Sequence, residues 1–294
     1  VSTAGGRAIA ALLVVLGAWS FAPAAARAHG EPAPLVFWGN FAPGVAACQR
    51  HIGHAAALCV NRVVRARGDC RLAAETGGGC NATALTATIQ DARADARAKV
   101  RAECSEIEVQ NLRYLDINEA LTDVINVCRS ADTALESAVF DAARPAGTGL
   151  DESTVDACLV ALRAGAGKLL AEALRERRLS LDRIAATNVV PAAKQGVVDH
   201  ASRRIAAGVT AAAAALAPEC PPPVFAALYG RDAATHLATV ATQADCFAGA
   251  VYVQDAVVCP PPLCGNAMRE SGEACDDGNL TAGDGCDASC RPDS

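Results

Sequence analysis

Fourteen cysteines lie between residues 48 and 290 of this 294-residue chain, and no two of them form a C-x-x-C pair. A zinc knuckle or a c-type haem attachment site would need such a pair. An even number of cysteines in an exported chain is instead typical of a disulfide framework. We therefore predict disulfides at all fourteen positions, which are Cys48, Cys59, Cys70, Cys80, Cys104, Cys128, Cys158, Cys220, Cys246, Cys259, Cys264, Cys275, Cys286 and Cys290.

The spacing of the first cysteines limits how they can pair. Cys48 and Cys59 are eleven residues apart, which is ~16 Å along a helix axis. A disulfide needs Cα atoms within ~7 Å. If both lie on one helix, each must join that helix to a neighbour. Two arrangements stay open: a hairpin with Cys48–Cys80 and Cys59–Cys70 pairs, or a local Cys70–Cys80 loop around the glycines at 77–79.

Residues 1–28 resemble a secretory signal peptide. Arg7 precedes the apolar run at 8–18, and Ala26-Arg27-Ala28 provides an A-x-A cleavage site. The most apolar stretch elsewhere, residues 205–217, is shorter than the ~20 residues that span a bilayer. We expect a secreted or extracytoplasmic protein with no transmembrane span once the signal is removed.

The composition favours closely packed helices. Alanine, the best helix former, occupies about 68 positions, whereas the chain has only 6 Phe, 2 Trp and 3 Tyr. Hydrophobic residues make up 52 % and charged residues 20 %, which excludes a disordered polyelectrolyte. The net charge of −6 gives no electrostatic footprint for nucleic acid. We predict an all-α, disulfide-stapled, Ala-rich bundle of six or seven helices.

Apolar periodicity and capping signals place these helices along the chain. Asn81 or Thr83 can cap the second helix, and Ser153-x-x-Asp156 resembles a capping box. The predicted helical ranges are 46–67, from the cap to about 104, 107–143, the segment after 153, 191–218 and 232–250. Their expected core positions are Ile52, Ala56, Val60, Val63, Val64, Leu112, Leu115, Ala120, Val124, Val127, Leu159, Leu162, Ala166, Leu169 and Ala173.

Proline-rich segments and a change in composition suggest how the chain is divided. After the signal at 1–28 we predict an irregular arm at 29–45 and a helical, disulfide-rich domain at 46–258. The Cys220-Pro-Pro-Pro segment separates two helices inside this domain, because three prolines cannot continue a helix. A second such segment supplies a Pro-rich linker at 259–263, followed by a small irregular module at 264–290.

The module at 264–290 resembles the Myxococcus cysteine-rich repeat, which is found in exported bacterial proteins. The resemblance is carried by Cys264-Gly-Asn, by Glu270-Ser-Gly-Glu-Ala-Cys275-Asp-Asp-Gly-Asn and by Gly283-Asp-Gly-Cys286-Asp-Ala-Ser-Cys290. Ala267 departs from the family pattern, which has glycine there. The resemblance implies a disulfide-bonded extracytoplasmic module without catalytic residues.

Acidic side chains crowd this module, whose only sizeable apolar residues are Met268 and Leu280. Carboxylate and amide oxygens are the ligands that Ca²⁺ prefers, so calcium is the one cofactor that the module suggests. The alternative is a solvated cluster of acidic turns, since the spacing is not that of an EF-hand. The candidate calcium ligands are Asp276, Asp277, Asn279 and Asp284, with Asp287 nearby.

No catalytic motif is visible, so we predict a non-catalytic protein with a structural or adhesion-type binding role at the cell exterior. Its partner would be an unknown protein or cell-surface ligand. One alternative is a transition-metal protein that uses the pair His51 and His54, or His29 at the mature N-terminus. The other is an exported enzyme whose site carries no recognisable motif.

Overall fold

The computed structural model describes residues 41–75, 78–140, 150–186 and 191–253, together with isolated positions between 283 and 291. These ranges contain eight helices and no β-strand, which confirms the predicted all-α, disulfide-stapled class. The helices are α1 (Pro43–Glu75), α2 (Ala82–Glu103), α3 (Glu106–Asn111), α4 (Ile117–Phe140), α5 (Glu152–Ala186), α6 (Pro191–Leu216), α7 (Pro222–Tyr229) and α8 (Ala233–Val251).

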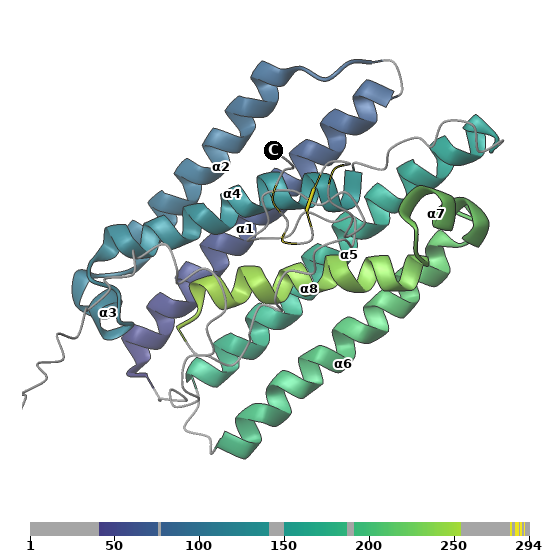
Figure 1. Ribbon diagram of the computed structural model, residues 1–294. Coiled ribbons are helices and arrows are strands. Elements are labelled where there is room, and N and C mark those ends of the chain that lie inside the picture. The colour runs from purple at the N-terminus through teal and green to yellow at the C-terminus, as the bar shows by residue number, and fades with distance from the viewer. Residues whose placement is uncertain are drawn as a thin grey trace, which may run out of the picture.

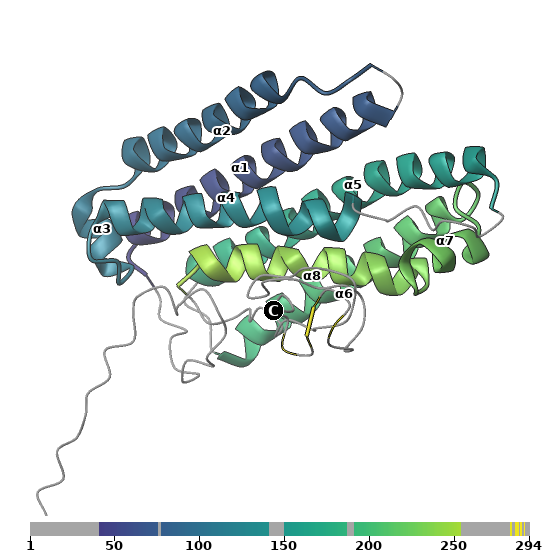
Figure 2. The same ribbon diagram turned by 45° about the horizontal axis from the view of Figure 1, so that its top comes forward.

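Two long helices, α1 and α5, form the centre of the bundle (Figure 1). Helix α1 packs against α2, α3, α4, α5 and α8, and α5 packs against α1, α4, α6, α7 and α8. The two central helices run antiparallel, and α2 and α6 lie at opposite sides of the bundle in both views (Figures 1 and 2). Every other helix therefore contacts at least one of the two central helices.

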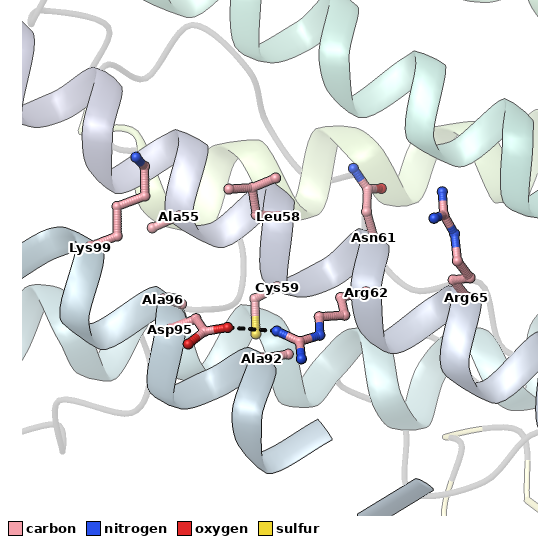
Figure 3. A pocket seen from close by; sticks show the side chains of 10 residues that line it. All are labelled: Ala55, Leu58, Cys59, Asn61, Arg62, Arg65, Ala92, Asp95, Ala96 and Lys99. Atoms are coloured by element: carbon pink, nitrogen blue, oxygen red, sulfur yellow. Dashed lines mark hydrogen bonds and ion pairs between the residues drawn. The ribbon is translucent and has the colours of Figure 1, made fainter. Parts of the chain in front are cut away.

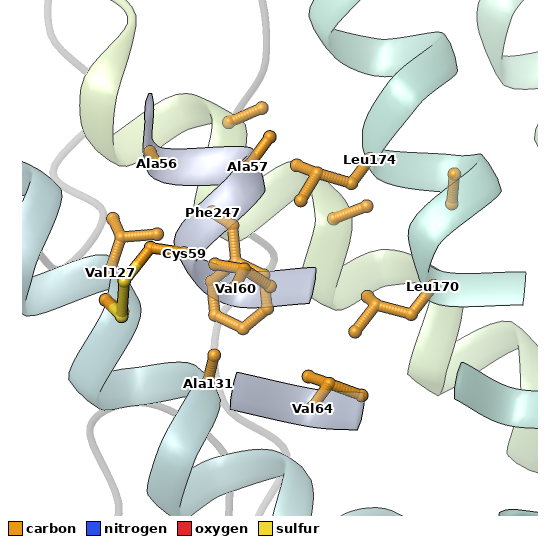
Figure 4. Close-up of a cluster of buried hydrophobic side chains, with 14 of the residues drawn as sticks. Ala56, Ala57, Cys59, Val60, Val64, Val127, Ala131, Leu170, Leu174 and Phe247 are labelled. Atoms are coloured by element: carbon orange, nitrogen blue, oxygen red, sulfur yellow. A yellow bond between two sulfur atoms is a disulfide. The ribbon is translucent and has the colours of Figure 1, made fainter. Parts of the chain in front are cut away.

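The core is built from small aliphatic side chains. Ala55 and Ala56 on α1 are 0 % and 2 % exposed, so neighbouring helices approach α1 closely. Figure 4 shows Phe247 from α8 lying among Val60 and side chains of α4 and α5. With the exception of Leu115, all the core positions expected from the sequence are buried.

Each end of the α1–α2 hairpin is cross-linked. The local Cys70–Cys80 disulfide closes the turn, with a Cα–Cα distance of 4.8 Å. Cys48 pairs with Cys104 at the opposite end, with Cα atoms 5.0 Å apart. The local loop is thus confirmed, and the alternative Cys48–Cys80 pairing is wrong. The reason is that α2 is long enough to bring its C-terminal end, not its N-terminal end, beside Cys48.

Two further disulfides join the hairpin and α5 to the rest of the bundle. Cys59, on α1, pairs with Cys128 on α4, so the alternative Cys59–Cys70 pairing is also wrong. Cys158, on α5, pairs with Cys220 immediately before α7. All ten described cysteines, including Cys246 and Cys286, are disulfide-bonded. The predicted disulfides at Cys259, Cys264, Cys275 and Cys290 lie outside the described residues.

The single helix predicted at 107–143 is wrong, because the chain breaks into α3 and α4. Ser105 and Glu108 form a complete capping box that starts α3. Asp116 then accepts a hydrogen bond from the Glu119 backbone N–H (2.9 Å) and starts α4. Between them Arg113 takes a positive φ of 69°, which ends α3. Leu115 consequently lies in the turn and is 82 % exposed instead of buried.

The other predicted helix starts agree with the structure to within a few residues, and two details of these starts differ. Helix α1 begins at Pro43, inside the arm that was predicted to reach residue 45. Asp151 caps α5, because its carboxylate accepts a hydrogen bond from the Thr154 backbone N–H (3.0 Å). Ser153 lies inside the helix, which begins at Glu152, so the capping box predicted at Ser153 is wrong. The proline segment after Cys220 separates two helices as predicted, and its Pro222 also starts the short helix α7.

Several predicted segments lie outside the described residues. These are the signal peptide at 1–28, most of the arm at 29–45, the linker at 259–263 and nearly all of the module at 264–290. Within the described part of the chain, no helix is both long and apolar enough to cross a membrane.

Candidate functional site

A cleft of about 440 Å³ opens between α1 and α5. Gly68 on α1 and Gly167 on α5 are half-buried and form its floor, and the exposed Ala164 on α5 also lines it. A Cβ atom added at Gly167 would meet only Val64 Cγ1, at 3.9 Å, so the floor is open above this glycine. Leu72 and Val160 stand at the rim and are 39 % and 38 % exposed. The rim of the cleft therefore offers two partly exposed apolar side chains to a ligand.

A second cleft, of about 510 Å³, runs along the other side of the same helix, between α1 and α2. Figure 3 shows Arg62 of α1 reaching Asp95 of α2 across this cleft, an ion pair of 2.6 Å. Leu58 lines the cleft and is 51 % exposed. Asn61 and Arg65 line both clefts, so they form the ridge between them.

Positive charge gathers along these clefts although the whole chain carries −6. Arg65, Lys99 and Lys168 line them and form no ion pair or hydrogen bond within the described part of the chain. Arg163 lies deeper in the α1–α5 cleft and is 8 % exposed. Burial lowers the pKa of its guanidinium, which nevertheless stays charged at neutral pH. The Nε and Nη1 atoms of Arg163 have almost no accessible surface, so Arg65 and Lys168 are the cations of the α1–α5 cleft that a ligand can reach.

The disulfides hold the walls of these clefts in place. Cys48–Cys104 and Cys70–Cys80 fix both ends of the α1–α2 pair, and Cys59–Cys128 ties the middle of α1 to α4. The wall formed by α5 is anchored through Cys158–Cys220. A ligand that enters the clefts therefore meets a preformed surface and loses little affinity to ordering the protein.

His51 and His54, the alternative metal ligands on α1, belong to no group of three potential metal ligands within the described residues. His51 contacts Glu103 with an N–O distance of 3.6 Å. Burial and the charge of Arg178 lower the pKa of His54. No group of three or more potential ligands occurs among the described residues, and His29 lies outside them. A metal-carrier role at the His51 and His54 pair thus gains no support.

Of the acidic residues in the C-terminal module, only Asp287 is described. Its carboxylate accepts hydrogen bonds from the backbone N–H groups of Ser289 (2.8 Å) and Arg291 (2.9 Å), which is the arrangement of a turn. The predicted calcium ligands Asp276, Asp277, Asn279 and Asp284 lie outside the described residues. Calcium binding there stays a prediction.

Two polar clusters inside the bundle are satisfied by their own members. Asp182 accepts hydrogen bonds from the Tyr252 hydroxyl (2.6 Å) and from Arg178 (2.9 Å), which attaches the end of α8 to α5. Burial raises the pKa of Asp182, while these two donors act in the opposite direction. Arg177 binds Asp245 through two hydrogen bonds and thereby joins α5 to α8. We assign both clusters to holding the helices together.

His236 on α8 is the most deeply buried imidazole of the described chain, at 1 % exposure. It lies edge-on to Phe225 (5.5 Å between ring centroids), and neither ring nitrogen has a hydrogen-bond partner. Burial, aided by the charge of Arg231, lowers its pKa from 6.5 to about 3. The native state therefore holds this histidine neutral under all but strongly acidic conditions.

Acid is expected to destabilise the protein through His236. Below pH 6.5 the unfolded chain binds a proton here that the native chain binds only near pH 3, so stability falls as pH falls through this window. The loss is about 1.4 kcal/mol per pH unit, or about 2 kcal/mol between pH 6.5 and 5. Urea unfolding at several pH values would measure it. His236→Phe should show a correspondingly shallower pH dependence, and an identical dependence in both proteins would contradict the assignment.

The α1 clefts were not predicted from the sequence. Leu58, Asn61, Arg65 and Leu72 are spaced by three, four and seven residues and share one face of α1. That spacing was visible, but a mixed apolar and basic face on a helix is usually solvated. No known protein family, curated protein or solved structure matches this chain.

Proposed function

We propose that this protein is a non-catalytic, extracytoplasmic binding protein whose ligand is anionic and partly apolar. The single observation that carries the proposal is the α1–α5 cleft, where the exposed cations Arg65 and Lys168 flank a surface of small and apolar residues and Asp69 is the one acidic lining residue. Clefts of this size that combine apolar walls with a few polar groups are typical ligand sites. The disulfides are compatible with export, in agreement with the secretory signal predicted at 1–28.

The proposal also includes the C-terminal module as an extracytoplasmic Myxococcus-type repeat. Its acidic residues differ in charge from the cleft, so the two parts would contact different partners. The motif at 264–290 supports this assignment. In this arrangement the bundle binds and the module attaches to, or spaces the bundle from, the cell exterior.

A small amphiphilic anion tests the proposal directly. The fluorescent probe 8-anilinonaphthalene-1-sulfonate has an aromatic body and one sulfonate, so it should bind the oxidised, full-length protein in a saturable manner. Lys168→Glu places a like charge beside the sulfonate, and Ala164→Trp places a large side chain over the cleft. Each variant should weaken binding about ten-fold, which corresponds to about 1.4 kcal/mol.

Matched control variants on α2 distinguish binding at the cleft from nonspecific binding of the probe to the protein surface. Arg97→Glu and Ala94→Trp make the same kinds of change at exposed positions that do not line the clefts. Both should bind the probe as the unmodified protein does, and circular dichroism should show all four variants fully helical. Equal probe binding by all variants would place the probe elsewhere and contradict the proposed site.

A further inference from the structure

We propose that an acidic amphipathic helix of a partner protein docks in the α1–α5 cleft, packing against α1 and α5 as a third helix. This inference rests on the proposed function above, because it names the ligand of the same site. The outward face of α1 carries the first argument. Asn61, Arg65, Gly68 and Leu72 line the cleft at steps of four, three and four residues, so they share one face of α1. Glycine on this face lets another backbone approach closely, and Leu72 supplies an apolar contact at the end of the face.

The facing side of α5 has a matching spacing. Val160, Ala164, Gly167 and Ala171 line the cleft at steps of four, three and four residues. Helices α1 and α5 run antiparallel (Figure 1), so Leu72, near the end of α1, lies at the same end of the cleft as Val160, near the start of α5. Small side chains on this face leave room for a helix, since interaxial distances of 8–10 Å depend on the size of the residues at the contact.

The length of the cleft suits about three helical turns. On α1 it extends from Asn61 to Leu72, which is ~16 Å along the axis at ~1.5 Å per residue. A helix of that length can place three apolar anchors on one face at i, i+4 and i+7. These anchors would cover the rim residues Leu72 and Val160 and the small-residue floor.

The charge of the cleft predicts that the docking helix is acidic. Arg65 and Lys168 line the cleft, are exposed, and form no ion pair or hydrogen bond within the described part of the chain. Glutamates flanking the apolar anchors would lie close to these cations, whereas lysines at the same positions would be repelled. The exposed carboxylate of Asp69 is the only opposing charge among the lining residues.

The shape of the cleft favours a protein helix over a membrane surface as the occupant. The cleft lies between two helices, and residues of both helices line it at helical spacing. A docked helix can pack along such a trough over its whole length, whereas a flat layer of lipid headgroups would contact mainly its rim.

A designed peptide provides the probe. We would label an 18-residue peptide that has leucines at the alternating three- and four-residue spacing and glutamates at the flanking positions. A second peptide has lysines in place of the glutamates, and a third has the same composition with the leucines scrambled. Fluorescence anisotropy with the oxidised, full-length protein should show saturable binding of the acidic peptide, with the other two at least ten-fold weaker.

Variants of the protein test whether the peptide binds in the α1–α5 cleft. Lys168→Glu and Ala164→Trp should weaken the acidic peptide at least ten-fold, while the controls Arg97→Glu and Ala94→Trp should leave it unchanged. Lys168→Glu should also bind the lysine peptide better than the unmodified protein does, an exchange of specificity that simple loss of folding cannot produce.

Three outcomes would overturn the inference. Equal binding of the scrambled and patterned peptides would show that no helical face is recognised. If the unmodified protein co-sediments with phosphatidylglycerol vesicles and the cleft variants do not, the cleft binds a membrane instead of a helix. Localised binding of the small anionic probe without any peptide binding would overturn the helix but keep the proposed function, whereas failure of both probes would remove both.

Discussion

Replacing both Cys59 and Cys128 by alanine is expected to lower the free energy of unfolding by about 4 kcal/mol. This disulfide joins α1 to α4 across a sequence separation of 69 residues, so it removes much conformational freedom from the unfolded chain. Both cysteines are almost completely buried, at 1 % and 0 % exposure, and their replacement also leaves small voids in the core. Chemical denaturation of the oxidised protein, monitored by far-ultraviolet circular dichroism, would measure the loss.

The Cys70–Cys80 disulfide supplies the matched control. It closes a separation of only 10 residues at the exposed tip of the α1–α2 hairpin. The same double alanine replacement there should cost less, about 2–3 kcal/mol, because a short loop has less entropy to lose. If the two double variants lose equal stability, loop length is not the origin of the stabilisation.

Asp245→Ala is expected to destabilise the bundle by about 3–5 kcal/mol. It would leave the Arg177 guanidinium, whose side chain is 5 % exposed, in the interior without its carboxylate. The present contacts are bidentate, at 2.6 Å from Nε to Oδ1 and 3.1 Å from the second nitrogen to Oδ2. Burial raises the pKa of the Asp245 carboxyl, and the hydrogen bonds and charge of Arg177 act in the opposite direction.

Two further variants separate the cost of an unpaired charge from the value of the pair. Asp245→Asn keeps a hydrogen-bond acceptor and should cost less than Asp245→Ala. Replacing both residues, with Arg177→Met and Asp245→Leu, removes the buried charges together and should recover most of the loss. Equal destabilisation in the single and double variants would show that packing, not the charge, dominates at this position.

The helical class followed from local properties that a sequence displays. Abundant alanine favours helix at almost every position. The apolar stripe from Leu159 to Ala173 predicts which face of the helix is buried, whichever helices pack against it. Capping signals at two helix starts were not recognised in the sequence. Asp116-x-x-Glu119 and Ser105-x-x-Glu108 both start helices, yet the longer apolar periodicity around them suggested one continuous helix.

Disulfide pairing shows where local information ends. The distance argument required Cys48 and Cys59 to bond with neighbouring helices instead of each other, and they do. Which neighbours they meet depends on the length of α2 and on the position of α4 beside α1. Both are consequences of packing the whole bundle, which no local spacing encodes.

The sequence by itself determined that the described chain is helical, that its cysteines are paired and which helix faces are buried, because these follow from propensity, cysteine number and periodicity. Only the tertiary structure decided that a basic face of α1 lies beside a small-residue face of α5. Arg65 and Lys168 are about a hundred residues apart in the chain, and each alone is typical of a solvated helix surface. Antiparallel packing of α1 and α5 brings them to one cleft, and the binding site that we propose depends on that juxtaposition.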